Sequence, residues 1–129
     1  MKKLIYFLMI IIGASTITSC EYDKVEMGFP TSITFSNIGG EEIVSSSSLD
    51  FSFISHANIH NYNNGNQGKI SKTDNTYCST YEWLKIEYTD NGTDVKVVAE
   101  PNTTGKSRKL HIEIYCGKKY DTVKVEQNK

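Results

Sequence analysis

Apolar and polar residues alternate through most of residues 83–127, which is the pattern of strands that bury one face and expose the other. Turn residues separate these strands about every ten positions, and Asp90-Asn91-Gly92 and Gly117 mark two of the turns. The inward rows are Leu84, Ile86 and Tyr88; Val95, Val97 and Ala99; Leu110, Ile112, Ile114 and Cys116; and Val123 and Val125. Short alternating strands in this arrangement predict an all-β, antiparallel sandwich.

The pattern is weaker before residue 55. Ile33-Thr34-Phe35 predicts a first strand, Gly39-Gly40 a hairpin turn, and Ile43-Val44 the start of a second strand. A third predicted strand has three apolar residues on one face, namely Leu49, Phe51 and Phe53. These segments predict that the sandwich begins near Pro30.

Residues 55–82 show no sustained period and are rich in Asn, Gly and Tyr. A long polar loop in a compact domain is usually functional or disordered. We therefore expect a loop from Ser55 to Glu82 that carries ligand contacts, with a solvated insertion as the alternative. A short strand near residues 68–71 is compatible with the pattern.

The first nineteen residues have the features of a secretory signal, with Lys2-Lys3, an apolar run over residues 4–12 and small residues after it. Ile17-Thr18-Ser19-Cys20 resembles a bacterial lipobox, and this resemblance implies that Cys20 is acylated and becomes the mature amino terminus. An ordinary signal peptide that is cleaved near a cysteine is the alternative. The predicted organisation is a signal at 1–19, a lipidated Cys20 with a tether over 20–29, and a folded domain at 30–129.

The order of motifs from Trp83 onward resembles the BACON domain, the Bacteroidetes-associated carbohydrate-binding module. The matching residues are Trp83, Leu84, Val95, Val97, Asn102, Gly105, Arg108, Ile112, Ile114, Val123, Val125 and Gln127. The resemblance implies an immunoglobulin-like β-sandwich in an envelope protein of polysaccharide-using bacteria. We accordingly expect a lipid anchor in the outer membrane or at the cell surface, with the periplasmic face as the alternative location.

Charge and motifs narrow the classes of function. The chain of 129 residues has a formal charge of −1, and loss of Lys2 and Lys3 leaves 12 basic against 15 acidic residues, or −3. This balance disfavours a nucleic-acid partner. The sequence contains no nucleophile motif or phosphate-binding loop, and the adjacent Glu41 and Glu42 would point to opposite faces of a strand. We predict neither an enzyme nor a cofactor.

Two pairs of residues raise the question of a metal or a disulfide. His56 and His60 have the i, i+4 spacing of helical metal ligands, but they lie in a predicted Asn-rich loop, which favours two solvated histidines and no metal site. Cys78 and Cys116 belong to a chain predicted to be exported, where a disulfide is permitted. Either they form a disulfide or they remain two separate thiols.

The candidate binding residues are aromatic. Trp83 has the opposite phase to Leu84 in the strand pattern, which predicts an exposed ring. Such a ring could stack on sugars together with Tyr77 and Tyr81. The BACON resemblance implies instead that Trp83 is structural. Tyr62 completes the candidate set. Asn102 and Arg108 are instead interpreted as residues that hold a loop.

The predicted function is that of a non-catalytic, lipid-anchored envelope protein that binds carbohydrate or host glycoprotein weakly. The alternative is a structural or accessory protein that binds another envelope protein.

Overall fold

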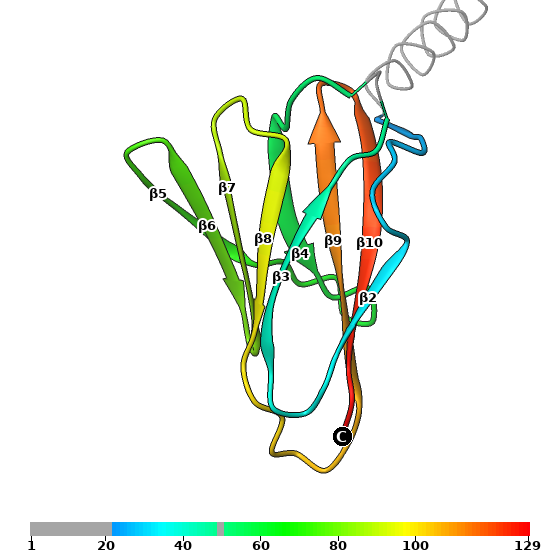
Figure 1. The fold of residues 1–129 in the computed structure, drawn as a ribbon, viewed down its shortest axis with the longest axis vertical. Coiled ribbons are helices and arrows are strands. Elements are labelled where there is room, and N and C mark those ends of the chain that lie inside the picture. The colour runs from blue at the N-terminus through cyan, green and yellow to red at the C-terminus, as the bar shows by residue number, and fades with distance from the viewer. Residues whose placement is uncertain (1–21, 49–50) are drawn as a thin grey trace, which may run out of the picture.

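The computed structural model describes residues 22–48 and 51–129, and these form a two-sheet β-sandwich (Figure 1). Ten strands and no helix occur in the described ranges, so the predicted all-β sandwich is confirmed. None of the described segments is therefore a helix that could cross a membrane. The predicted signal peptide and Cys20 lie outside the described residues.

The first sheet has the order β1-β10-β9-β4, and β2 also pairs with β10. Its strands are β1 (Asp23–Lys24), β2 (Ser32–Phe35), β4 (His56–His60), β9 (Arg108–Cys116) and β10 (Lys119–Gln127). The short β1 and β2 run parallel to β10, whereas β9 is antiparallel to both β10 and β4.

The second sheet has the order β3-β8-β7-β6-β5, with every neighbouring pair antiparallel. Its strands are β3 (Gly40–Ser45), β5 (Lys69–Thr73), β6 (Thr76–Tyr81), β7 (Leu84–Thr89) and β8 (Asp94–Ala99). The β5 and β6 strands lie at the left side of Figure 1, and β5 is exposed at all five positions.

The core lies between the two sheets and includes the rows that alternation predicted. Seven residues of these rows are fully buried, at 0 % exposure: Ile86, Val95, Val97, Ile112, Ile114, Val123 and Val125. The turn at residues 90–92 joins β7 to β8 as predicted, with Asn91 at a φ of 59°. Gly117 joins β9 to β10 with a φ of 62°, a conformation in which glycine carries no steric cost.

Three predictions in the first half are wrong. Residues 51–54 form no strand, and Leu49 lies outside the described residues. Gly39 and Gly40 do not close a hairpin, because β2 and β3 belong to different sheets and the two glycines carry the chain between them. The interval 55–82 contains β4, β5 and β6 instead of one long loop, and β5 confirms the short strand that was an alternative.

The folded part begins earlier than Pro30. Asp23 donates its N–H to the carbonyl of Lys118 at 2.9 Å, and Val25 donates to that of Tyr120 at 2.9 Å. Met27 and Phe29 are buried in the core, at 5 % and 7 % exposure. The described part of the predicted tether is therefore bound to the sandwich along β10.

The strands run between two ends of the sandwich, the N-terminal end and the C-terminal end. The N-terminal end carries Tyr22 and the turns at 90–92 and 117–118. The C-terminal end carries Asn128, the β4–β5 loop (61–68) and the β8–β9 loop (100–107). Figure 1 shows the marked C-terminus at the lower end and the N-terminal segment near the upper end.

Candidate functional site

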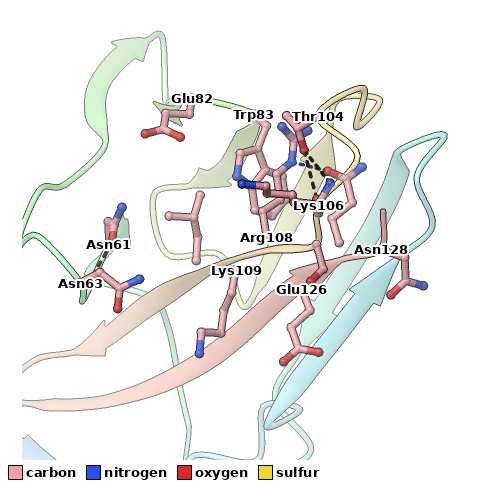
Figure 2. A pocket seen from close by; sticks show the side chains of 13 residues that line it. Asn61, Asn63, Glu82, Trp83, Thr104, Lys106, Arg108, Lys109, Glu126 and Asn128 are labelled. Atoms are coloured by element: carbon pink, nitrogen blue, oxygen red, sulfur yellow. Dashed lines mark hydrogen bonds between the residues drawn. The ribbon is translucent and has the colours of Figure 1, made fainter.

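A polar groove of about 650 Å³ opens at the C-terminal end of the sandwich (Figure 2). The β4–β5 loop, the β6–β7 turn, the β8–β9 loop and the last residues of β10 surround it. Its lining residues are Asn61, Asn63, Glu82, Trp83, Thr104, Lys106, Ser107, Arg108, Lys109, Leu110, Glu126, Gln127 and Asn128. Amide, hydroxyl and charged groups therefore dominate the lining.

Trp83 forms part of the wall, but it offers no free stacking face. Its side chain is only 5 % exposed, and the guanidinium carbon of Arg108 lies 4.7 Å from the ring centroid. The prediction from strand phase that Trp83 points into solvent is therefore wrong, because Trp83 precedes β7 and does not follow its alternation. The structural role implied by the BACON resemblance agrees with the structure.

Arg108 is held in place by the fold. Its Nε donates to Oε1 of the fully buried Gln127 at 2.8 Å, and Nη2 donates to the carbonyls of Glu100 and Pro101 at 3.4 and 3.3 Å. The planar guanidinium makes both contacts at once. The prediction that Arg108 bonds loop carbonyls is confirmed.

Asn102 fixes the β8–β9 loop. Its amide donates to the carbonyls of Lys106 at 2.7 Å and Asn128 at 3.0 Å, and its Oδ1 accepts from Thr104 N–H and Oγ1 at 3.1 and 2.7 Å. This loop-holding role was predicted and is confirmed. Lys106 and Thr104 consequently have a fixed backbone beside the groove.

The groove carries charges of both signs. Lys106, Lys109 and Glu82 are exposed along it, and none of the ion pairs within the described ranges includes them. Glu126 is paired with Lys124 at 3.0 Å. The groove thus offers ammonium donors and a carboxylate acceptor to a polar ligand.

Tyr62 provides an exposed aromatic ring next to the groove. It lies between two groove residues in the chain, Asn61 and Asn63, is 51 % exposed, and stacks on His111 with ring centroids 4.3 Å apart. His111 and the groove residue Lys109 are two positions apart on β9, so they lie on the same outer face of the sheet. Groove and ring therefore form one continuous surface.

Glu113 anchors the Tyr62 ring and its surroundings. Tyr62 and Tyr115 each donate to this carboxylate at 2.6 Å, and His60 Nε2 lies 3.3 Å from it. Burial, followed by the hydrogen bond to Glu113, raises the pKa of both tyrosines, so they remain neutral donors at physiological pH. Burial lowers the pKa of His111, which favours a neutral imidazole under the Tyr62 ring.

The other aromatic candidates are not brought together with Trp83 on one exposed face, contrary to the prediction. Tyr81 is half-buried, and its hydroxyl accepts from Asn61 and Asn64 amides at 3.3 and 3.4 Å, which ties the β4–β5 loop to β6. Tyr77 stacks on Tyr88 at 5.0 Å and carries Lys72 Nζ 4.8 Å above its ring. Only Tyr62 remains as an exposed platform beside the groove.

The cysteines and histidines fall on strands. Cys78 on β6 and Cys116 on β9 belong to different sheets and are free thiols, so the disulfide alternative is not realised. His56 and His60 lie on β4, which contradicts the predicted loop position, and the His60 side chain is only 15 % exposed beside Glu113. Within residues 22–48 and 51–129, no cluster of metal-ligating side chains occurs.

Sequence reasoning missed the part that the outward row of β9 plays. None of Lys109, His111, Glu113 and Tyr115 is among the sequence-predicted site residues. Lys109 lines the groove, His111 and Glu113 contact Tyr62, and Tyr115 shares Glu113 with it. The available signal was Tyr115, an aromatic residue in the outward phase of the clearest strand. Its cross-strand partner Tyr120 stacks on it at 5.2 Å.

The fold and groove together define a β-sandwich with a polar site at one end of its strands. Residues 70–128 match the BACON family, described as "Putative binding domain, N-terminal", so the predicted BACON domain is confirmed over β5 to β10. This is a family of binding domains and not of enzymes.

A solved structure is similar to the chain along most of its length. It is described as "NMR structure of the protein from Bacteroides thetaiotaomicron" and has a TM-score of 0.52 and 19 % identity, covering 84 % of this chain and 85 % of that one. At this identity the likeness shows the fold alone. No curated protein matches the chain.

Proposed function

We propose that this protein is a non-catalytic, lipid-anchored module that binds carbohydrate, either free or on a glycoprotein, along the groove and Tyr62. The observation that carries the proposal is the exposed Tyr62 ring, which continues the polar groove on the outer face of β9. The match of residues 70–128 to a binding-domain family supports it.

The two parts of this surface suit the two parts of a sugar. The apolar face of a pyranose packs on an aromatic ring, and Tyr62 has one ring face covered by His111 and half of its surface exposed. Sugar hydroxyls both donate and accept hydrogen bonds, and the groove offers the Asn63 amide, Lys109 and Glu82. Because one ring and a few hydrogen bonds must offset lost translational freedom, the affinity of a single module is weak.

The test is a glycan array followed by calorimetric titration of the best glycan. Tyr62→Ala should weaken binding at least about tenfold, which corresponds to about 1.4 kcal/mol. Phe53→Ala is the matched control, because Phe53 is also an exposed aromatic residue but lies outside the groove, next to Ile54, which donates its N–H to the Gly92 carbonyl at the N-terminal end. Equal affinity of wild type and Tyr62→Ala for every glycan would overturn this site.

A second pair of variants tests the groove separately. Asn63→Ala combined with Lys109→Ala removes two exposed groove residues, whereas Asn66→Ala combined with Lys69→Ala removes the same residue types outside it. The first pair should abolish detectable binding and the second should leave it unchanged. Thermal melts of all variants establish that the fold is intact.

The anchor is proposed from the sequence resemblance of Ile17 to Cys20 to a lipobox. Acyl chains on Cys20 would hold the protein stably at a membrane, since each buried CH₂ contributes about 0.8 kcal/mol. Cys20→Ala should move the full chain to the soluble fraction and prevent labelling by a fatty-acid analogue. A membrane-bound, labelled Cys20→Ala variant would refute the anchor.

A protein partner is the second candidate, and the edge of the second sheet favours it. All five residues of β5 are exposed, and in the described part of the chain this strand pairs only with β6. An exposed edge accepts an added strand from another chain. Ser71→Pro should abolish co-purification of such a partner from solubilised envelopes and leave glycan binding unchanged.

A further inference from the structure

We propose that the N-terminal end of the sandwich rests in the headgroup layer of the membrane, with Tyr22 and Phe53 as its lipid contacts. The groove at the opposite end then faces away from the bilayer. This inference rests on the lipid anchor of the proposed function, and it adds a surface and an orientation that the anchor alone does not give.

The first argument is that the chain is fixed almost up to the anchor. Residues 23 and 24 pair with Lys119 and Tyr120 as β1, and Met27 donates its N–H to Asp121 Oδ2 at 3.0 Å. Met27 and Phe29 are buried in the core, so this segment cannot leave β10 without exposing them. A domain held in this way does not swing on a long tether.

The second argument is the length of the remaining connection. Cys20 precedes Tyr22 by two residues. Consecutive Cα atoms lie about 3.8 Å apart, so the Cα atoms of Cys20 and Tyr22 are at most roughly 7.6 Å apart. With acyl chains on Cys20, Tyr22 must therefore lie at the level of the lipid headgroups.

The third argument is the chemistry of this end. Tyr22 is 58 % exposed and Phe53 is 40 % exposed. The ring of Tyr22 packs edge-on against Tyr115 at 5.3 Å, and Tyr115 stacks on Tyr120 at 5.2 Å, so the exposed ring has a rigid aromatic base. Aromatic side chains are enriched at the membrane–water interface, where an apolar body and a polar tip are both accommodated.

Phe53 is attached to the same end by hydrogen bonds. Ser55 donates its N–H to the Tyr115 carbonyl at 2.8 Å, and its Oγ accepts from Gly117 N–H at 3.0 Å. The segment carrying Phe53 is thus tied to the β9–β10 turn beside β1. Tyr22 and Phe53 are therefore both exposed aromatic residues of the N-terminal end of the sandwich.

Charge plays the smaller part in this contact. Lys24, Lys118 and Lys119 are exposed here, and Asp23 and Glu26 on the same segment offset most of their charge. The contact is therefore carried by the aromatic rings and is expected to depend little on anionic lipid. Long lysine side chains can still place their ammonium groups among the phosphates.

The orientation follows from the length of β9. This strand has nine residues and leads from the groove to the β9–β10 turn. At about 3.4 Å per residue it spans roughly 30 Å. With the N-terminal end at the membrane, the groove beside the start of β9 is held away from the lipid, where a large glycan can reach it.

The experiment uses the full-length lipoprotein in phosphatidylcholine vesicles with or without brominated acyl chains, which quench nearby tryptophan. Tyr22→Trp and Phe53→Trp place a reporter at the N-terminal end. Ile38→Trp is the matched control, because Ile38 is 78 % exposed in the β2–β3 connection at the opposite end. Trp83 is a constant background in all three variants.

The added emission of Tyr22→Trp or Phe53→Trp should fall by at least half in brominated vesicles, and that of Ile38→Trp should not change. Equal quenching at both ends, or no quenching at the N-terminal end of a vesicle-bound protein, would overturn the proposed orientation. Wild-type protein that fails to bind vesicles would instead refute the anchor, so the two failures are distinguishable. Thermal melts show which reporters are folded, and either N-terminal reporter suffices.

Discussion

At the residue scale, an isoleucine contributes differently to stability depending on whether it lies on the buried or the exposed face of its strand. Ile112 on β9 is fully buried between Val123 and Ile59, its cross-strand neighbours, whereas Ile43 on β3 is 66 % exposed. Burial of apolar surface is the dominant stabilising term in folding. The inward phase, and not the identity of the residue, therefore decides its contribution to stability.

We predict that Ile112→Ala lowers the free energy of unfolding by about 2–5 kcal/mol, because it leaves a cavity at a fully buried site. The exposed Ile43→Ala should change it by no more than about 0.5 kcal/mol. Urea denaturation followed by Trp83 fluorescence measures both. Similar values for the two variants would mean that the faces of the sheets are assigned incorrectly.

At the scale of elements, the edge between β4 and β6 is closed by buried polar groups. Ser79 donates to Asn58 Oδ1 at 2.5 Å, and the Asn58 amide donates to the Gly68 carbonyl at 3.2 Å. Asn58 and Ser79 are 4 % and 0 % exposed. Because buried polar groups must be paired, these bonds fix where the β4–β5 loop crosses the edge, and that loop carries Tyr62.

Gly68 is the residue that this arrangement least allows to change. A Cβ at this position would meet Ser79 Oγ and Asn58 Oδ1. We predict that Gly68→Ala lowers the free energy of unfolding by at least about 2 kcal/mol, because it either overpacks the site or leaves buried groups unpaired. The exposed Asn66→Ala, in the same loop, should cost less than about 0.5 kcal/mol in the same denaturant series. A stable Gly68→Ala protein would show that the edge can rearrange.

At the scale of the whole molecule, the N-terminal segment belongs to the domain. It contributes β1, β2 and the core side chains Met27, Phe29, Ile33 and Phe35, and it connects the proposed anchor rigidly to the sheet that also supports the groove. The proposed position at the membrane and the presentation of the groove thus both depend on one sheet, whose central strands β9 and β10 run from one end to the other.

The predicted consequence concerns Met27 and Phe29. Met27→Ala should destabilise the protein by about 2–5 kcal/mol and Phe29→Ala by about 3–5 kcal/mol, since both side chains are almost completely buried. Glu26→Ala, at an exposed position between β1 and this pair, should have an effect below about 0.5 kcal/mol. A domain that begins at Pro30 would show no loss of stability in thermal or urea melts of either core variant.

The sequence by itself determined the second half of the sandwich. Strands with one buried and one solvated face carry an alternation that is visible without coordinates, and the strand segments within residues 84–125 have it. The local roles of Asn102 and Arg108 followed from their side-chain chemistry and the loop beside them. The match to a BACON domain rests on this same part of the chain.

Only the tertiary structure decided the remainder, because the determining contacts there are not local. The β5 strand is exposed on both faces and shows no alternation, and β4 includes an Asn58 that is buried through bonds to the distant Ser79. Trp83 is buried by Arg108, which is 25 positions away, and Tyr62 is placed by His111 and Glu113. The groove combines segments from four parts of the chain, so no single stretch of sequence could reveal it.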